Sequence, residues 1–432
     1  MPQLFSYQDA NFETAFNELL EKKREAVTDV SGTVRAIIAD IRKRGDEAVV
    51  EYTNKFDRQQ LSAETLRVTA EEIDAAIRSI GAETMDALKL AHNRIKSHHE
   101  RQLPKDDRYT DAIGVELGSR WTAVEAVGLY VPGGTASYPS SVLMNAVPAK
   151  VAGVDRLAMV VPTPDGQLQP LVLAAAQLAG VDEIYRIGGA QAVAALAFGT
   201  KTITPVSKIV GPGNAFVAEA KRQVFGTVGI DMIAGPSEVL VIADKDNDPD
   251  WIAMDLLAQA EHDASAQSIL ITDDEQLGKR VAEAVERQLQ TLPRKDIASA
   301  SWNDFGAIII VSNMQQAAEL ANSIAAEHLE IMTDDPESVF ANIRNAGAVF
   351  LGRHTPEAIG DYVGGSNHVL PTSRSARFSS GLSVLDYMKR TSVLRCKPEH
   401  LESIGSAAMK LAEVEGLDAH KLSIAIRGNF ER

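Results

Sequence analysis

The stretch Asp255-Leu-Leu-Ala-Gln-Ala-Glu-His-Asp263 lies between two series of alternating strand-like and helix-like segments. Asp248-Pro249 ahead of it is a typical helix start, so we predict a helix that ends near this stretch. The apolar stripe of the helix would consist of Trp251, Ile252, Leu256 and Leu257. Gln259 and His262 are three residues apart and would share one helix face. A Gln-x-x-His pair is too short to be specific, and two surface side chains at a helix end are the ordinary alternative.

The segments before this stretch indicate βαβ units. Helical segments alternate with short β-rich runs at 124–131, 156–162, 183–187 and 208–210. This alternation is typical of a parallel sheet. Three of the runs lead into turns whose glycines let the backbone approach a ligand: Pro132-Gly-Gly134, Gly188-Gly-Ala-Gln191 and Gly211-Pro-Gly-Asn214. The Gly-x-Gly-x-x-Gly fingerprint is absent, so these glycines fit either a dinucleotide site or ordinary tight turns.

A second series of the same rhythm follows the stretch. Its strand-like runs lie at 268–272, 307–311, 329–333 and 348–351. Two such series predict an α/β fold with two Rossmann-like parallel-sheet modules and a cleft between them. We expect the first module at 123–238 and the second at 239–371. The helix with Gln259 and His262 lies at their junction, where two-domain enzymes commonly place the active site.

Helical segments are expected on both sides of the modules. Residues 1–122 are predicted to form a helical N-terminal region that packs on the second module, with helical periodicity at Ser31–Arg44 and again from Ala70 to His99. No candidate chemistry is found there, and we expect solvent-exposed side chains at His92, His98 and His99. Residues 372–432 are predicted to form a helical C-terminal tail, with a helix at 398–414.

The composition predicts a globular protein of two or three domains, because 432 residues exceed one ordinary core. A formal net charge of −16 argues against a nucleic-acid partner, which requires clustered Lys and Arg. No apolar run approaches the roughly 18 residues of a membrane span, and the first residues lack signal-peptide features, so we expect a cytoplasmic protein without a membrane partner. The only cysteine is Cys396, so a metal would need nitrogen and oxygen ligands.

Further polar clusters fall at the ends of predicted elements in the second half of the chain. They are Ser237-Glu238 before a strand, Glu327-His328 at a helix end, Asp361 and His368 in a glycine-rich segment, and Glu415 and His420 around a turn. Each has an ordinary structural alternative. A histidine at the C-terminal end of a helix, for example, interacts favourably with the helix dipole.

Seven short motifs occur along the chain in a fixed order: Tyr130-Val-Pro-Gly-Gly134, Gly188-Gly-Ala-Gln-Ala192, Gly211-Pro-Gly-Asn-Ala215, Ala234-Gly-Pro-Ser-Glu238, Gln259-Ala-Glu-His262, Glu327-His-Leu329 and Ser366-Asn-His-Val-Leu-Pro371. In this order and rhythm the chain resembles the histidinol dehydrogenase family over nearly its full length. Each motif alone is weak, but their sequence together is specific. Only the N-terminal 30 residues and the end of the C-terminus contribute little to the resemblance.

The resemblance implies the last step of histidine biosynthesis, in which L-histidinol is oxidised through L-histidinal to L-histidine while two NAD+ are reduced. It implies one zinc ion per subunit, held by Gln259, His262, Asp361 and His420. It implies substrate contacts from these four residues and from Ser237, His328, His368 and Glu415. It implies NAD contacts from Tyr130, Gln191 and Asn214. The family is a homodimer whose C-terminal segment completes the neighbour's site, so Glu415 and His420 would act in the partner's site.

The resemblance and the chemistry assign catalysis to two adjacent residues. Hydride removal from a primary alcohol requires a general base for the hydroxyl proton, and His328 is suited to that role. Oxidation of the aldehyde requires a tetrahedral adduct, and Cys396 lies outside every cluster named above. Water is then the nucleophile, and Glu327 would activate it, as the family's mechanism assigns.

Two alternatives remain open at this point. One is a related zinc and NAD dehydrogenase that acts on another small alcohol, such as a sulfonated diol. Glu415 favours histidinol, because a carboxylate attracts a cationic amine and repels a sulfonate. The other is a catalytically silent zinc-binding scaffold, and the Glu327-His328 pair argues against it.

Overall fold

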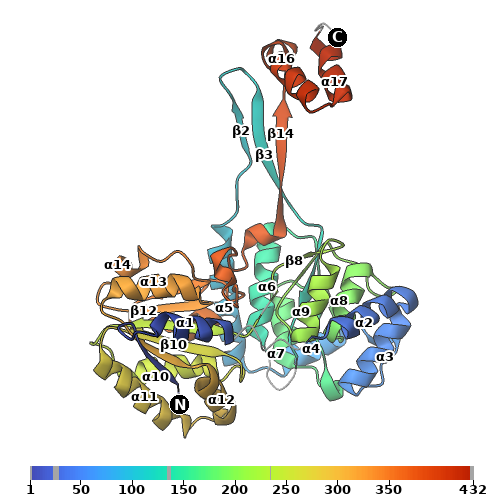
Figure 1. The fold of residues 1–432 in the computed structure, drawn as a ribbon. Coiled ribbons are helices and arrows are strands. Elements are labelled where there is room, and N and C mark those ends of the chain that lie inside the picture. Colours follow the sequence, from blue (N-terminus) through green and yellow to red (C-terminus); the bar gives the residue numbers. More distant parts are fainter. Residues whose placement is uncertain (1, 23–28, 134–137, 234, 429–432) are drawn as a thin grey trace. The chain divides into compact units, whose positions relative to one another are not determined.

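The structure, a computed structural model, describes residues 2–22, 29–133, 138–233 and 235–428 (Figure 1). Two motif residues, Gly134 and Ala234, lie outside the described residues. The chain divides into two compact units. The first, called the body, consists of residues 1–102 and 125–387, and the second, called the arm, consists of residues 103–124 and 388–432.

The first module of the body is built on a parallel five-stranded sheet. Its strands lie in the order β6 (Glu183–Tyr185), β5 (Arg156–Val160), β4 (Ala126–Tyr130), β7 (Lys208–Val210) and β8 (Gly229–Ile230). In chain order this is 3-2-1-4-5. The helices of this module are α6 (Pro139–Ala152), α7 (Pro170–Leu178), α8 (Gly189–Phe198) and α9 (Ala215–Val224).

The second module repeats this plan. Its parallel sheet has the order β1 (Gln3–Ser6), β11 (Ala307–Ile310), β10 (Gln267–Thr272), β9 (Glu238–Ala243), β12 (His328–Met332) and β13 (Ala348–Leu351). Without the edge strand β1, this is again 3-2-1-4-5. The helices are α10 (Pro249–Ala260), α11 (Glu275–Leu289), α12 (Lys295–Phe305), α13 (Met314–Ile324), α14 (Pro336–Phe340) and α15 (Glu357–Tyr362). The predicted α/β fold with two parallel-sheet modules is confirmed.

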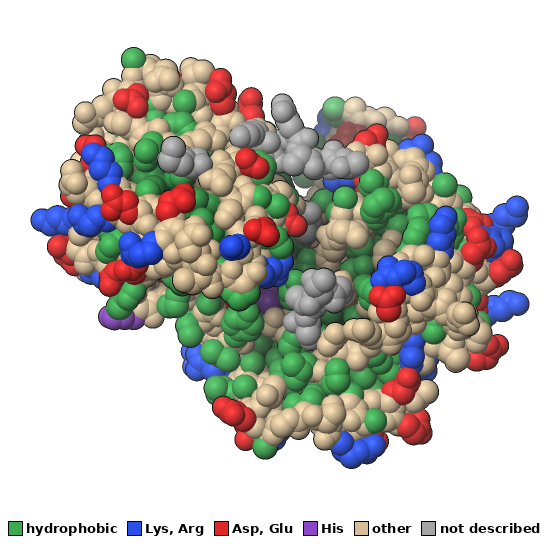
Figure 2. Space-filling view, turned by 90° about the horizontal axis from the view of Figure 1, so that it is seen from below, with side chains coloured by type: hydrophobic (Ala, Val, Ile, Leu, Met, Phe, Trp, Pro, Cys, Tyr) green, Lys and Arg blue, Asp and Glu red, His purple; other side chains and the backbone are tan. Residues whose placement is uncertain are grey.

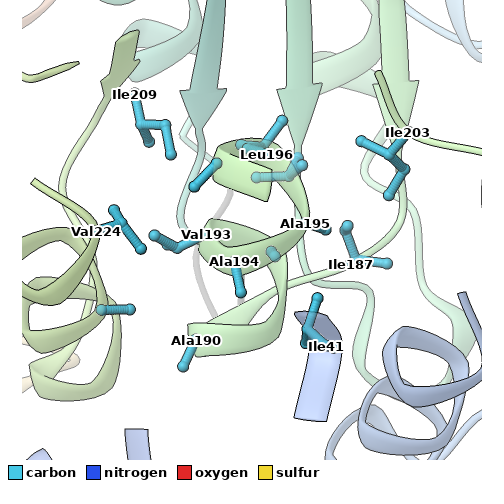
Figure 3. Packing of buried hydrophobic residues seen from close by; sticks show 14 of the residues in the cluster. Ile41, Ile187, Ala190, Val193, Ala194, Ala195, Leu196, Ile203, Ile209 and Val224 are labelled. Atoms are coloured by element: carbon cyan, nitrogen blue, oxygen red, sulfur yellow. The ribbon is translucent and has the colours of Figure 1, made fainter. Parts of the chain in front are cut away.

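The central strands are apolar runs because helices cover both faces of each sheet. Every residue of β9 and β10 is buried, for example. In the first module α8 contributes small side chains, so the helix packs closely against its surroundings. Figure 3 shows Ala190, Val193 and Ala194 of α8 in the same cluster as Ile41, which comes from the N-terminal part of the chain.

The N-terminal region packs mainly on the first module, so the expected packing of residues 1–122 on the second module is wrong for most of it. Only β1 and α1 (Phe12–Lys22) join the second module, where Phe12 and Phe16 enter the core. The next four helices contact helices of the first module, as Figure 1 shows for α2 beside α8: α2 (Ser31–Arg44), α3 (Asp46–Asp57), α4 (Ala70–Arg78) and α5 (Ala82–Glu100).

The arm contains an antiparallel sheet that the helical interpretation of its sequence missed. In this sheet β3 (Glu116–Ala123) lies between β2 (Asp107–Thr110) and β14 (Met388–Arg395). Two helices follow, α16 (Pro398–Val414) and α17 (Asp418–Gly428), and they pack against each other. The predicted helix at 398–414 is therefore confirmed. The strands β2, β3 and β14 were not expected.

The surface shows no field of a single charge on the face drawn in Figure 2, where acidic and basic side chains are interspersed around a hollow with apolar walls. Among the described helices, none combines the length and the apolar character needed to cross a membrane.

Candidate active site

His328 is the first residue of β12, and its ring is bound to the start of the adjacent strand. Its Nδ1 lies 3.0 Å from the carbonyl oxygen of Glu238. A carbonyl only accepts hydrogen bonds, so Nδ1 carries the proton and Nε2 has the free lone pair. Nε2 is buried and has no hydrogen-bond partner among the described residues. Burial lowers the pKa of His328 to about 3, which keeps the imidazole neutral and able to accept a proton at Nε2.

Glu327 is held by the same residue of β9. The backbone N–H of Glu238 donates to Glu327 Oε2 at 3.0 Å, and that oxygen lies 3.8 Å from His328 Nδ1. The backbone N–H and carbonyl of Glu238 thus hold both candidate catalytic side chains, Glu327 and His328. The prediction that Glu327-His328 ends a helix is wrong: α13 ends at Ile324, Ala325 adopts a left-handed conformation, and the pair leads into β12.

The site lies at the amino-terminal edge of the second sheet. His328 pairs in register with Val239 and Ala348, and Glu238 pairs with Gln267, so four strands begin within one register position of each other at this edge. Parallel α/β sheets ordinarily bind ligands at the carboxyl ends of their strands. In the second module the candidate residues Glu327 and His328 are at the opposite edge, but they still lie between β9 and β12, where the strand order reverses.

Two buried carboxyl groups, Glu357 and Glu330, and the partly buried Asp255 lie behind His328, and no role was predicted for them from the sequence. Glu357 Oε1 is 3.5 Å from His328 Nδ1, and the N–H of Glu357 donates to Glu330 Oε1 at 2.6 Å. Burial raises the pKa of Glu357 and of Glu330 well above the usual value, and raises the pKa of Asp255 to about 6. The only signal in the sequence was Glu330 itself, a charged residue two positions after His328 in an otherwise apolar strand.

Gln259 and His262 lie at the end of α10, as predicted, and Asp248 caps the start of this helix. Gln259 is fully buried, and its Nε2 lies 3.4 Å from His262 Nδ1. Its Oε1 is buried without a hydrogen-bond partner in the described part of the chain. Such an orphaned acceptor oxygen is costly unless it has a ligand, and it fits a cation. Trp251 was expected in the apolar stripe, but it is 47% exposed.

Asp361 and His368 are the remaining titratable residues of the candidate site that belong to the body. His368 Nδ1 lies 3.7 Å from Asp361 Oδ1. Burial raises the pKa of Asp361 to about 6 and lowers that of His368 to about 4. Ligand atoms of His328, Glu357 and Asp361 lie within 4.8 Å of one another, so a second possible metal-binding set shares Asp361 with the predicted one.

The loop that carries His368 is attached to the first module through Asn367. Asn367 Nδ2 donates to the carbonyl of Met144 in α6 at 2.7 Å and lies 3.3 Å from His99 Nε2. His99 Nδ1 in turn donates to Gln102 Oε1 at 2.7 Å. The expectation that His99 is solvated is wrong, because α5 packs against α6 and buries this side chain completely.

The three predicted NAD residues lie at the carboxyl-terminal edge of the first sheet. Tyr130 ends β4, and its hydroxyl accepts a hydrogen bond from Gly189 N–H at 3.0 Å. Gln191 follows in α8 and is buried, with an Oε1 that lacks a hydrogen-bond partner within the described ranges. Asn214 caps α9, where its Oδ1 accepts from Phe216 and Val217. The strands β4 and β7 flank the point where the strand order reverses, the usual ligand site of such sheets.

Three remaining residues are placed less directly. Ser237 precedes β9, and its carbonyl accepts from Gln267 N–H at 3.0 Å. Glu415 is the C-cap residue that follows α16, and His420 lies in α17. Both are exposed on the arm, and their place in the site stays a prediction.

Together these features define the class of protein. Two parallel sheets of the same strand order, one with glycine turns at its carboxyl edge and one with a buried acid–base group, are the framework of an α/β oxidoreductase.

Comparison with known proteins identifies the family. The family model of histidinol dehydrogenase matches residues 20–428. The histidinol dehydrogenases of Agrobacterium fabrum and Bradyrhizobium diazoefficiens are each 68% identical, over 98% and 100% of this chain and the same shares of their own. A solved histidinol dehydrogenase from Elizabethkingia anophelis superimposes with a TM-score of 0.94 at 36% identity, covering 99% of this chain and 98% of the other. The chain belongs to the histidinol dehydrogenase family.

Proposed function

We propose that this protein oxidises L-histidinol through L-histidinal to L-histidine with two NAD+, using a bound zinc ion. The observation that carries the proposal is the pair Glu327 and His328, held by the two backbone groups of Glu238 with His328 Nε2 free. Membership of the family supports the reaction. The acid–base pair argues against a silent scaffold.

The first oxidation needs a base and a hydride acceptor. NAD+, when bound, accepts the hydride in both oxidations. His328 Nε2 takes the hydroxyl proton, because this nitrogen of the neutral imidazole has a lone pair that no hydrogen bond occupies. The proton arrives on a ring whose Nδ1 side faces the Glu238 carbonyl and the Glu327 carboxyl group. These oxygens stabilise the imidazolium once the proton has arrived.

The second oxidation needs water. Addition of water to the aldehyde forms a hydrate, which loses a hydride and a proton to become the acid. Glu327 takes a proton from this water, since its carboxyl group lies next to His328 and is only 6% exposed. A cysteine route has no support, because Cys396 is exposed and lies outside every cluster of candidate site residues.

Zinc fits the residues of the body. Gln259 Oε1, His262 and Asp361 supply the oxygen and nitrogen donors that zinc accepts, and His420 is proposed as the fourth ligand. Zinc, when bound, would anchor the imidazole and amine of the substrate. The set of His328, Glu357 and Asp361 is a weaker choice, because burial favours the protonated, uncharged form of Glu357.

The other contacts complete the proposal. Tyr130, Gln191 and Asn214 bind NAD at the carboxyl edge of the first sheet, where Gln191 Oε1 is free to accept a hydrogen bond. Ser237, His368 and Glu415 contact histidinol. The active form is a homodimer in which Glu415 and His420 come from the partner chain.

Replacement of His262 by Asn should remove zinc and activity together while the protein stays folded. The change removes one nitrogen ligand beside Gln259, and its effect is local because His262 is exposed after α10. Metal analysis of the purified variant and its thermal unfolding would be measured beside wild type. His354→Asn, at a histidine outside the proposed ligand set, is the matched control and should retain zinc. Full zinc content in His262→Asn would remove this residue from the ligand set.

The proposed reaction is tested by counting NADH per molecule of histidinol consumed. Two equivalents are expected, because each oxidation reduces one NAD+. One equivalent would show that the reaction stops at histidinal. Oxidation of a sulfonated diol but not of histidinol would establish the rival substrate instead.

A further inference from the structure

Lys221 and Asp231 form a buried ion pair in the first module. Lys221 lies in α9, Asp231 follows β8, and their side chains are only 2% and 1% exposed. Lys221 Nζ contacts Asp231 Oδ1 directly. Burial of two charges costs desolvation that their attraction offsets only when further hydrogen bonds satisfy them. The other hydrogen bonds of Lys221 and Asp231 therefore show which part of the chain this ion pair positions.

The pair holds one residue, Gly211, from both sides. Lys221 Nζ donates to the Gly211 carbonyl at 2.9 Å, and Gly211 N–H donates to Asp231 Oδ2 at 2.8 Å. The backbone N–H and carbonyl of Gly211 are thus each hydrogen-bonded to one member of the ion pair. Hydrogen bonds to charged groups are stronger than those between neutral groups.

Gly211 occupies a position that other residues cannot take. Its φ is +112°, and a Cβ there would come within 2.1 Å of the Tyr130 carbonyl oxygen. The turn that follows β7 is therefore packed directly against the end of β4. Gly211 begins the turn that ends at Asn214, so its position determines where Asn214 and the start of α9 lie relative to Tyr130.

We propose that Lys221 and Asp231 are positioning residues for NAD, which hold the turn Gly211–Asn214 against Tyr130 in the geometry that binds the dinucleotide. This inference rests on the proposed NAD site. Neither side chain touches the cofactor, because both are buried beneath the turn. Their loss acts on NAD affinity through the two hydrogen bonds to Gly211.

The test uses neutral double variants of the full-length enzyme. Lys221→Met alone leaves Asp231 buried and unpaired, which endangers folding. The double variant Lys221→Met/Asp231→Leu removes both charges and both bonds to Gly211. Lys221→Met/Asp231→Asn also removes the charges but keeps an acceptor for Gly211 N–H. The dissociation constant of NAD+ would be measured by calorimetry, with KM for NAD+ and for histidinol.

The Met/Leu variant should bind NAD+ about tenfold or more weakly, because small displacements of binding groups have effects of this size, whereas KM for histidinol should stay within about twofold. The Met/Asn variant should be affected less. Arg353→Met is the control: it breaks a partly buried ion pair with Asp244 in the second module, so it should lower thermal stability without changing NAD+ affinity.

Wild-type NAD+ affinity in the folded Met/Leu variant would overturn the positioning role and leave the pair as a stabilising contact only. Equal weakening for NAD+ and histidinol would also overturn it, since the effect would then be general. A failure of the proposed function is distinguishable: in that case wild type itself would bind no NAD+, and the inference would fall with it.

Discussion

The His328→Asn variant should oxidise histidinol about 100- to 10,000-fold more slowly than wild type, the usual effect of losing a general base. Asn can still donate to the Glu238 carbonyl, which His328 Nδ1 reaches at 3.0 Å, but it has no basic nitrogen in place of Nε2. The loss should appear in kcat, because proton removal belongs to the transition state. Single-turnover measurement of NADH at saturating histidinol checks this expectation.

Glu327→Gln is the variant to compare with His328→Asn, because it tests the second oxidation instead of the first. Gln is isosteric and keeps an oxygen to accept from Glu238 N–H, so the position of His328 is preserved. Oxidation of histidinol to the aldehyde should be nearly normal, while oxidation of supplied histidinal should be slow because water is no longer activated. Cys396→Ala should be fully active. Equal losses in both half-reactions would contradict the division of labour between Glu327 and His328.

Mixing two inactive variants should restore about a quarter of wild-type sites if the arm completes the partner's site. His328→Asn damages the body and His420→Asn damages the arm, which are separate units of the chain. In a mixed dimer with exchanged arms, one site carries both substitutions and the other carries neither. Random pairing makes half of the dimers mixed, so one site in four is intact under two-fold symmetry.

The measurement requires conditions that let dimers dissociate and reassociate, with exchange confirmed by mass spectrometry. The matched control is a mixture of His328→Asn with Glu327→Gln, two lesions on the same unit. That mixture should regain no complete oxidation to histidine beyond that of its two components, because one subunit's body contributes both residues and every site keeps one lesion. If His328→Asn and His420→Asn exchange subunits and activity does not return, His420 acts within its own chain.

Most strands of the two parallel sheets could be predicted from the sequence. A strand covered on both faces is a short apolar run bounded by turn residues, and the run Lys208–Val210 was predicted with its observed bounds as β7. The arm could not be predicted in this way. In β2 every residue is exposed, and in β14 most are, so these strands have no buried face to impose a two-residue period.

The sequence predicted Glu327, His328 and Glu238 near strand and helix ends, but it did not predict that they lie at the amino edge of the second sheet. The glycine turns do lie at the carboxyl edge of the first sheet, where the sequence placed them, and NAD binding there stays a prediction. The rule that ligands bind at the carboxyl ends of strands misleads in the second sheet, because His328 begins its strand instead of following one. Glu357 and His99 gave no signal, since a single buried polar residue has no periodicity and its partners are far away in the sequence.

The proposed site at the amino edge uses none of the described side chains at the opposite edge of the second sheet. The loops there are occupied by structural contacts, such as Arg353 with Asp244 and Asp334. Lengthening a loop costs only about 0.6 kcal/mol of closure entropy for each doubling of its length. That edge is therefore the side on which inserted peptides, labels or fused domains can be attached with least disturbance, as long as Asp244 and Arg353 remain paired.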